Sequence, residues 1–276
     1  MRHTIPGSRV ILTGASSGIG RQLALQLGTG GAKLVINARR GTLLEEVRQE
    51  IQEANDRAGK PTFVELVVGD ITLPQTRQTL VDRVVEAYGG LDILLNNAGG
   101  AASGLFETGT PERLTKVLNL NLVSAVEMTR LALPWLKCGE RRKDAPTAPM
   151  IVYLSSVVGF RGVTHYSEYC AAKFAVRGFS ESIRTELHRY GIDVLCVCPG
   201  STDTEFFTRY LENTGEPTWP HHSRVSPQYV AGQILRAIRR GKHEITPFFL
   251  GKVLRFLNNF CPRFIDRAML WYAEGK

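Results

Sequence analysis

The sequence predicts an α/β fold, a doubly wound parallel sheet of about seven strands with helices on both faces. Short apolar runs rich in β-branched residues alternate along the chain with longer segments of helical spacing. The first apolar run ends in a glycine-rich turn that leads into a helical segment. Repeated βα units make the strands parallel and cover both faces of the sheet. With 276 residues, 43% of them hydrophobic, the chain is long enough for one such domain.

Local signals justify each element in turn. The strands are apolar runs bounded by glycine, proline or polar clusters, and we expect them at 9–13, 33–38, 62–68, 91–95, 150–155, 192–198 and 243–246. The helices are expected from 22 to at least 27, and at 42–58, 74–88, 111–137, 167–190 and 227–240. Ser226 before Pro227 is a typical start for the last of these helices. We expect residues 1–247 to form a single domain, and residues 248–276 a helical extension packed on it or on a partner.

The first turn has the residues of a pyrophosphate site. Residues 13–20 read Thr-Gly-Ala-Ser-Ser-Gly-Ile-Gly and directly follow the first apolar run. Gly14, Gly18 and Gly20 allow a tight turn and close approach of a ligand, while the amides of the next helix attract an anion. The alternative is an ordinary strand–helix turn rich in small residues. The tyrosine and lysine described next favour the nucleotide site.

Tyr169 and Lys173 are four residues apart in a predicted helix, so their side chains fall on one face. A nearby ammonium favours the phenolate, so we expect a pKa of Tyr169 well below its usual value of about 10. Ser156, thirteen positions upstream of Tyr169, supplies a hydroxyl that can hold a substrate oxygen beside the phenol. Any helix can carry Tyr-x-x-x-Lys by chance. Its combination with the glycine-rich turn predicts an active site that transfers protons.

With these landmarks in order, residues 6–247 resemble the short-chain dehydrogenase/reductase family, in its shorter single-domain branch with a Rossmann-type sheet. Residues 13–20 match the family's Thr-Gly-x-x-x-Gly-x-Gly turn, and residues 96–99 match its Asn-Asn-Ala-Gly element. The resemblance implies an oxidoreductase acting on CH–OH groups. It would transfer hydride between a nicotinamide cofactor and a ketone or aldehyde, interconverting it with an alcohol. The resemblance also implies a homodimer or homotetramer.

The resemblance implies roles for particular residues. The family's catalytic tetrad falls on Asn121, Ser156, Tyr169 and Lys173. Family spacing selects Asn121 over Asn119, and Ser156 over Ser155. Asn121 would hold a water for proton relay. The residues implied for cofactor binding are Gly14, Ser16, Ser17, Gly18, Ile19, Gly20, Arg39, Arg40, Asp70, Ile71, Asn97, Ala98, Gly99, Tyr169, Lys173, Pro199, Gly200, Thr202 and Thr204.

The end of the second strand indicates which nicotinamide cofactor is used. A site selective for NAD usually has Asp or Glu there to bind the ribose 2′-hydroxyl. Residues 37–40 are instead Asn-Ala-Arg-Arg, and an arginine binds a 2′-phosphate through a charge-assisted fork. Arg39 is the first candidate and Arg40 the second, while the alternative is that one arginine simply caps the sheet edge. Ser17 stands where many NADP-using relatives have a basic residue. NADP(H) is nonetheless favoured over NAD(H).

Residues 248–272 are apolar but interrupted by Lys252, Arg255, Arg263, Asp266 and Arg267. No uncharged span of about 18 residues occurs, so we expect two short amphipathic helices separated by Pro262 and no transmembrane helix. These helices would cap the substrate pocket, contact another subunit, or lie on a membrane with basic residues facing lipid headgroups. Such extensions resemble those of family members acting on steroids, retinoids or ketosphingoid lipids. We therefore expect a lipophilic substrate, under a covering segment at 205–224.

Composition and motifs limit which other partners and protein classes remain. The net charge of +8 comes without a basic stripe or nucleic-acid motif, so we expect no nucleic-acid partner. The five cysteines lack zinc or redox spacing. Cys196 and Cys198 are expected in the core, no metal is expected, and the location would be cytoplasmic, with or without membrane contact. Two alternatives stay open: a catalytically silent NADP(H)-sensing protein, which commonly lacks the tyrosine or lysine, and a sugar-nucleotide epimerase or dehydratase, which usually has Gly-x-x-Gly-x-x-Gly.

Overall fold

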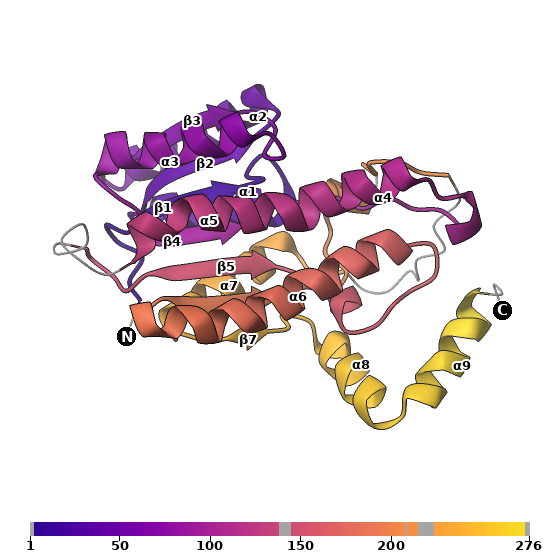
Figure 1. Cartoon of the computed structure of the whole chain (residues 1–276). Helices are drawn as coiled ribbons and strands as arrows, with labels where there is room; N and C mark the ends of the chain where they lie inside the picture. The colour runs from indigo at the N-terminus through magenta and orange to yellow at the C-terminus, as the bar shows by residue number, and fades with distance from the viewer. Residues whose placement is uncertain (1–2, 138–144, 208, 215–223, 274–276) are drawn as a thin grey trace.

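The core of the protein is a parallel sheet. The structure is a computed structural model that describes residues 3–137, 145–207, 209–214 and 224–273. Within these ranges, seven parallel strands form one sheet in the order β3-β2-β1-β4-β5-β6-β7 (Figure 1). Their bounds are β1 Arg9–Thr13, β2 Lys33–Ala38, β3 Val64–Val68, β4 Ile93–Asn96, β5 Met150–Leu154, β6 Asp193–Val197 and β7 Glu244–Ile245. The predicted α/β fold is therefore confirmed.

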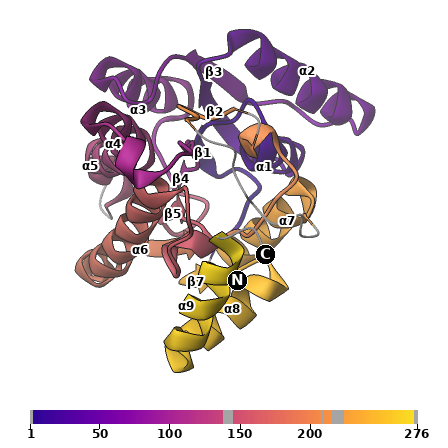
Figure 2. The same cartoon turned by 90° about the vertical axis from the view of Figure 1, so that its right-hand side faces the viewer.

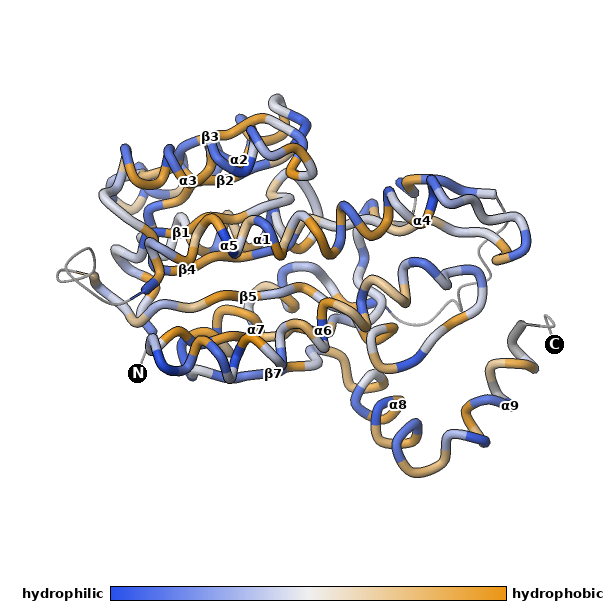
Figure 3. The backbone as a smooth tube through the Cα atoms, in the orientation of Figure 1, coloured by the Kyte–Doolittle hydropathy of each residue, from blue (hydrophilic) through white to orange (hydrophobic). Residues whose placement is uncertain are grey.

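Helices cover both faces of this sheet (Figure 2). One face carries α1 Gly18–Thr29, α2 Gly41–Arg57 and α7 Pro227–Arg239, and the other carries α3 Pro74–Tyr88, α5 Ser124–Leu136 and α6 Ser167–Leu187. Along β1, Val10 and Leu12 pack into the first of these layers, while Ile11 packs into the second. Burial on both faces explains why the strands read as continuous apolar runs, which Figure 3 shows in the hydropathy of the central strands.

The strand order reverses direction at β1. The chain passes from β1 outward to β2 and β3, then returns to β4 on the other side of β1. In an open parallel sheet, ligands bind outside the carboxyl ends of the strands at such a switch point. The carboxyl ends of β1 at Thr13 and of β4 at Asn96 lie there side by side, because Leu12 pairs with Leu95.

Two predicted helices differ in detail from the observed ones. The helix predicted at 111–137 consists of α4 Pro111–Leu118, a π-helical turn Asn119–Val123, and α5. Wide turns of this kind are frequent at functional sites. The turn buries Asn121 and leaves Asn119 exposed. The first helix begins at Gly18 rather than at 22, because the extended backbone of Ser17 already serves as its N-cap.

The C-terminal residues form two helices, as expected. α8 Phe249–Phe260 and α9 Pro262–Ala273 extend away from the body of the domain (Figure 1). Gly251 of α8 packs against Val157, and the amide of Asn258 donates to the carbonyl oxygen of Phe160 at 3.2 Å. Among the residues that the structure describes, no helix is long and apolar enough to cross a membrane. Of the expected covering segment at 205–224, residues 208 and 215–223 lie outside the described ranges.

Candidate active site

A cavity of about 330 Å³ lies at the carboxyl ends of the strands. It contains the side chains of Ser156, Tyr169 and Lys173, so the structure brings these three predicted residues together. The other predicted site residues that line it are Gly14, Ser16, Ser17, Gly18, Ile19, Gly20, Arg39, Arg40, Asp70, Ile71, Asn97, Ala98, Gly99, Pro199, Gly200, Thr202 and Thr204. Asn121 lies just behind the wall, next to Gly99 and Gly100.

The glycine-rich turn is held tightly against the end of β4. Gly14 has a left-handed backbone, with φ +68°. A Cβ atom at Gly20 would lie 2.1 Å from the carbonyl oxygen of Gly14, so only glycine fits there. The side-chain amide of Asn97 donates to the carbonyl oxygens of Thr13, at 2.8 Å, and of Gly14, at 3.0 Å. Asn97 thus lines the cavity and also fixes the shape of the turn.

Tyr169 sits at the start of α6 and is almost fully buried. Burial raises the pKa of Tyr169 above its usual value, and a hydrogen bond with the hydroxyl of Ser156 only partly offsets this effect. The expected lowering of the pKa is therefore not observed among these side chains. Desolvation of the phenol outweighs the influence of Lys173, whose Nζ lies 5.5 Å from the centre of the Tyr169 ring. The raised pKa keeps the phenol of Tyr169 protonated at neutral pH.

Lys173 is buried one helical turn further along α6. Its Nζ donates to the carbonyl oxygen of Leu154, at the end of β5, at 2.8 Å. Burial lowers the pKa of Lys173 to about 8. This value still lies above neutral pH, so the ammonium form dominates. Ser155 is separate from this chemistry, because its hydroxyl donates to the carbonyl oxygen of Lys173 at 2.8 Å and so joins β5 to α6.

Asn121 uses its side chain to hold the neighbouring loop. Its Nδ2 donates to the carbonyl oxygens of Gly100, at 2.8 Å, and of Val117, at 2.9 Å, while its Oδ1 accepts from the amide of Gly100 at 3.3 Å. A Cβ atom at Gly99 would lie 2.8 Å from this Oδ1 and 3.4 Å from Nζ of Lys173. Asn121 therefore lies near Lys173, but its amide is occupied by backbone groups. Its predicted role in water binding stays a prediction.

The two arginines after β2 lie in different surroundings. The Arg39 side chain is 67% exposed, and its Nη1 lies 4.0 Å from a carboxylate oxygen of Asp70. Arg40 turns toward the glycine-rich turn, where its Nη2 donates to the hydroxyls of Ser16, at 3.1 Å, and of Ser17, at 2.8 Å. Both arginines line the cavity. The sequence has no basic residue at position 17, but the guanidinium of Arg40 contacts Ser17 and so places a positive charge there.

Sequence reasoning missed two ion pairs around the site. Glu205 lines the cavity and pairs with Arg40, with Nη1 and Oε2 2.9 Å apart. Arg113 of α4 and Glu168, the residue before Tyr169, form a buried ion pair. The partners of each pair are far apart in the sequence, so no local spacing could have predicted them. The only available signal was their position, because Glu205 follows Thr204 and Glu168 precedes Tyr169.

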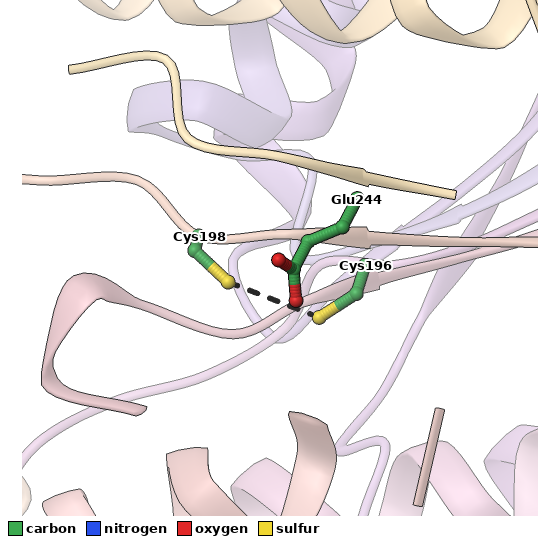
Figure 4. A group of neighbouring side chains, drawn as sticks. All are labelled: Cys196, Cys198 and Glu244. Atoms are coloured by element: carbon green, nitrogen blue, oxygen red, sulfur yellow. Dashed lines mark hydrogen bonds between the residues drawn. The ribbon is translucent and has the colours of Figure 1, made fainter. Parts of the chain in front are cut away.

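Cys196 of β6, Cys198 just beyond it and Glu244 of β7 form a compact group (Figure 4). Their possible ligand atoms lie within 4.8 Å of one another, and the two Sγ atoms are 3.9 Å apart. The carboxylate of Glu244 accepts hydrogen bonds from Arg177 Nε, at 2.9 Å, and from Arg255. A cation would have to compete with both guanidinium groups for this carboxylate. We therefore interpret the two thiols as core packing against Phe160.

The chain is similar to known proteins over most of its length. Residues 8–215 match the sequence profile of the family described as short chain dehydrogenase. The chain is 29% identical over 269 residues to a Drosophila melanogaster protein named "Dehydrogenase/reductase SDR family protein 7-like", covering 95% of this chain and 79% of that protein. It is 32% identical over 281 residues to "11-beta-hydroxysteroid dehydrogenase 1A" of Arabidopsis thaliana, covering 98% of this chain and 76% of that protein.

A solved structure has the same fold. The crystal structure of a short chain dehydrogenase/reductase from Burkholderia phymatum in complex with NAD superposes with a TM-score of 0.79 at 22% sequence identity, covering 92% of this chain and 94% of that chain. Together, the fold and the sequence matches define an oxidoreductase that acts on CH–OH or carbonyl groups. Because the family profile covers most of its length, the chain belongs to the short-chain dehydrogenase/reductase family.

Proposed function

We propose that the protein is an NADP(H)-dependent oxidoreductase that interconverts a lipophilic ketone or aldehyde with an alcohol, using Asn121, Ser156, Tyr169 and Lys173. The observation that carries this proposal is the placement of the last three side chains in one cavity with the glycine-rich turn. Such a cavity holds a proton donor, an oxygen-binding hydroxyl and a cation beside a site suited to a dinucleotide.

The residues around the turn fit a dinucleotide. The turn has no room for a side chain at Gly20, and the N-terminus of α1 lies directly behind it, which suits a pyrophosphate. Asp70 and Ile71 would border the adenine, while Arg39 and Arg40 would bind a 2′-phosphate. Pro199, Gly200, Thr202 and Thr204 would close the nicotinamide end. The Burkholderia phymatum relative was solved with NAD, so binding of both dinucleotides has to be compared.

The catalytic residues would then act as follows. Hydroxyl groups of Ser156 and Tyr169 donate hydrogen bonds to the carbonyl oxygen of the substrate. A bound nicotinamide would supply hydride chemistry at the carbonyl carbon, and these two hydroxyl donors would stabilise the negative charge that grows on the oxygen. Tyr169 transfers its phenolic proton to the oxygen, which completes the alcohol. The ammonium of Lys173 stabilises the resulting phenolate until it regains a proton. Oxidation runs through the same residues in reverse.

The wall near Tyr169 supports the proposal of a lipophilic substrate. Val157, Val158 and Phe206 line the cavity and belong to one apolar cluster with Tyr166. The Phe206 ring lies 5.4 Å from the ring of Tyr169. The Arabidopsis thaliana relative is named for a steroid substrate, which supports an apolar substrate here. Burial of an apolar substrate against this wall would supply binding energy next to the proton donor.

The test of this function is cofactor consumption at about 340 nm with a panel of carbonyls, including steroid ketones, retinaldehyde and 3-ketoacyl thioesters. Tyr169→Phe should abolish turnover, because it removes the proton donor, and should retain cofactor binding. Tyr229→Phe is the matched control, since Tyr229 is exposed on α7. Turnover by Tyr169→Phe would overturn the assignment. NADPH binding with no turnover of any substrate would favour a sensing protein instead.

We further propose that α8 and α9 contact a membrane surface. Large apolar side chains of these helices are exposed, and they are Phe249, Leu250, Phe256, Phe260, Phe264, Leu270 and Trp271. Lys252, Arg263 and Arg267 accompany them and would face anionic lipid headgroups. Phe256→Ser/Phe260→Ser should reduce sedimentation with liposomes that contain anionic lipid. Phe106→Ser is the control, since Phe106 is 82% exposed in the turn Phe106–Thr108, outside α8 and α9. Equal sedimentation of all proteins would contradict the proposal.

We also propose a homodimer or homotetramer. Leu114 of α4, Val123 of the π-helical turn and Phe174 of α6 are exposed apolar residues on helical segments that contact one another. Light scattering after size-exclusion chromatography measures the assembly directly. Val123→Glu should shift an oligomer toward the monomer, and a monomeric wild-type protein would contradict this proposal.

A further inference from the structure

Hydroxyl and guanidinium donors meet between the glycine-rich turn and the start of α2. Arg40 Nη2 donates to the hydroxyls of Ser16 and Ser17, and Arg40 Nη1 donates to the carboxylate of Glu205 at 2.9 Å. All four side chains line the cavity at the end where we propose that a 2′-phosphate binds. A carboxylate of the protein therefore already uses the cation that this phosphate would need. The hydrogen bond from Arg40 holds the pKa of Glu205 below its usual range, so Glu205 is charged at neutral pH.

Glu205 also belongs to the wall of the catalytic end of the cavity. It begins the short helical turn Glu205–Phe207, and the next residue, Phe206, packs its ring near that of Tyr169. A second cation, Arg209, holds Glu205 from within the same segment, with Nε and Oε2 3.2 Å apart. The contact with Arg40 therefore joins the cofactor side of the site to the substrate side. Any displacement of the Glu205 backbone also moves Phe206.

We propose that Glu205 is a specificity-determining residue, whose carboxylate competes with the 2′-phosphate of the cofactor for Arg40 and is released only by a cofactor that carries this phosphate. The proposal rests on the proposed use of NADP(H). A phosphate monoester brings close to two negative charges and three acceptor oxygens, so it can accept from Arg40 and from both serine hydroxyls. The uncharged 2′-hydroxyl of NAD(H) offers no comparable competition.

The energetics favour exchange rather than permanent pairing. The Glu205 and Arg40 side chains are 47% and 29% exposed, and ion pairs open to solvent contribute little to stability, so this pair can be replaced. After the exchange, Arg209 still holds the carboxylate on its own segment. Binding of the 2′-phosphate would therefore remove the contact between the turn that carries Phe206 and Arg40, while the contact with Arg209 stays in place. The type of cofactor would in this way affect the turn that carries Phe206 on the substrate side of the cavity.

The experiment compares dissociation constants for NADP⁺ and NAD⁺ by isothermal titration calorimetry in five proteins: the wild type, Glu205→Gln, Glu212→Gln, Arg40→Met and Arg40→Met/Glu205→Gln. Glu205→Gln should tighten NADP⁺ binding about fivefold, because the competing exposed pair is lost, and should leave NAD⁺ binding unchanged. Glu212→Gln is the matched control, since Glu212 lies in the same segment and pairs with Lys116 at 3.9 Å. In an Arg40→Met background, Glu205→Gln should have no effect on NADP⁺ binding, since the contested cation is absent.

Other results would contradict either the competition for Arg40 or the proposed cofactor. If Glu205→Gln leaves NADP⁺ binding unchanged in a protein that prefers NADP⁺, the competition is wrong and the proposed cofactor stands. If Glu205→Gln weakens NAD⁺ binding, Glu205 accepts from the ribose 2′-hydroxyl and the competition is again wrong. If the wild-type protein binds NAD⁺ more tightly than NADP⁺, the proposed cofactor itself is wrong.

Discussion

The ion pair between Arg113 of α4 and Glu168 of α6 holds the first turn of the helix that carries Tyr169. Arg113 Nε and Nη2 lie 2.8 and 2.6 Å from Oε1 of Glu168, and the two side chains are 1% and 9% exposed. Arg113 also donates to the carbonyl oxygen of Leu105 and to the hydroxyl of Thr214. Because Glu168 directly precedes Tyr169, we expect Arg113→Met to destabilise the fold and to misplace the phenol.

The magnitude follows from burial. Removing one partner of a buried pair costs about 3–5 kcal/mol, because the other charge stays buried without compensation. Arg113→Met should therefore lower the free energy of unfolding by about 3–5 kcal/mol, a large part of the typical total of about 5–15 kcal/mol. Arg113→Met/Glu168→Gln should lose less than the single variant, since an amide is cheaper to bury than a carboxylate. Arg48→Met, which breaks the exposed pair with Glu45, should cost less than about 1 kcal/mol.

Urea denaturation measures these differences, and kcat reports the position of Tyr169. Burial raises the pKa of Glu168, but hydrogen bonds from the backbone, Arg113 and Ser167 outweigh it and hold the pKa below its usual range. A lowered carboxyl pKa stabilises the fold above the unfolded value of 4.5, and this contribution is lost as the pH falls through the folded value. Arg113→Met should reduce that acid-side loss. A free energy within about 1 kcal/mol of wild type, together with unchanged kcat, would refute the reasoning.

Two further substitutions test the site. Burial lowers the pKa of Lys173 from 10.5 to about 8, so between these values the unfolded state binds more protons. This group should therefore raise the free energy of unfolding by up to about 3 kcal/mol over that pH interval, and Lys173→Met should abolish the rise. Equal pH profiles of the two proteins in urea denaturation would contradict this prediction. Gly20→Ala should abolish cofactor binding and lower the Tm, because the methyl group meets the Gly14 carbonyl at 2.1 Å. Gly178→Ala, with open space around the added methyl, should be neutral or stabilising, and an equal Tm loss in both would reject this explanation.

Elements with local signals were predicted closely. α3 begins at Pro74 and ends before Gly89, as expected, because proline suits the first turn of a helix and Gly89 adopts φ +75° at its end. β2 also matches its predicted bounds. Its residues read as one apolar run since helices bury it from both sides. The glycine-rich turn was readable for the same reason, because its requirement for glycine is local.

Features that depend on contacts between distant segments were not predictable. The π-helical turn at Asn119–Val123 has no distinct spacing in the sequence, and the pairs of Arg113 and Arg40 join residues far apart in the chain. The pKa of Tyr169 was expected from one neighbouring cation, whereas burial from several elements decides its direction. The division at residue 247, the roles of the site residues and the preference for NADP(H) stay predictions.

The two sides of the cavity differ in how far polar contacts hold them. Ser156 lies just beyond β5, and Tyr169 and Lys173 lie on α6; both elements take part in the apolar packing of the sheet. The opposite wall combines apolar packing of Phe206 and Tyr210 with polar contacts, of which the one between Glu205 and Arg40 is exposed. Polar contacts near solvent can be exchanged for water or ligand at little cost, whereas apolar packing cannot. The contact between Glu205 and Arg40 can therefore be exchanged for a ligand, while the position of the Tyr169 phenol stays constant.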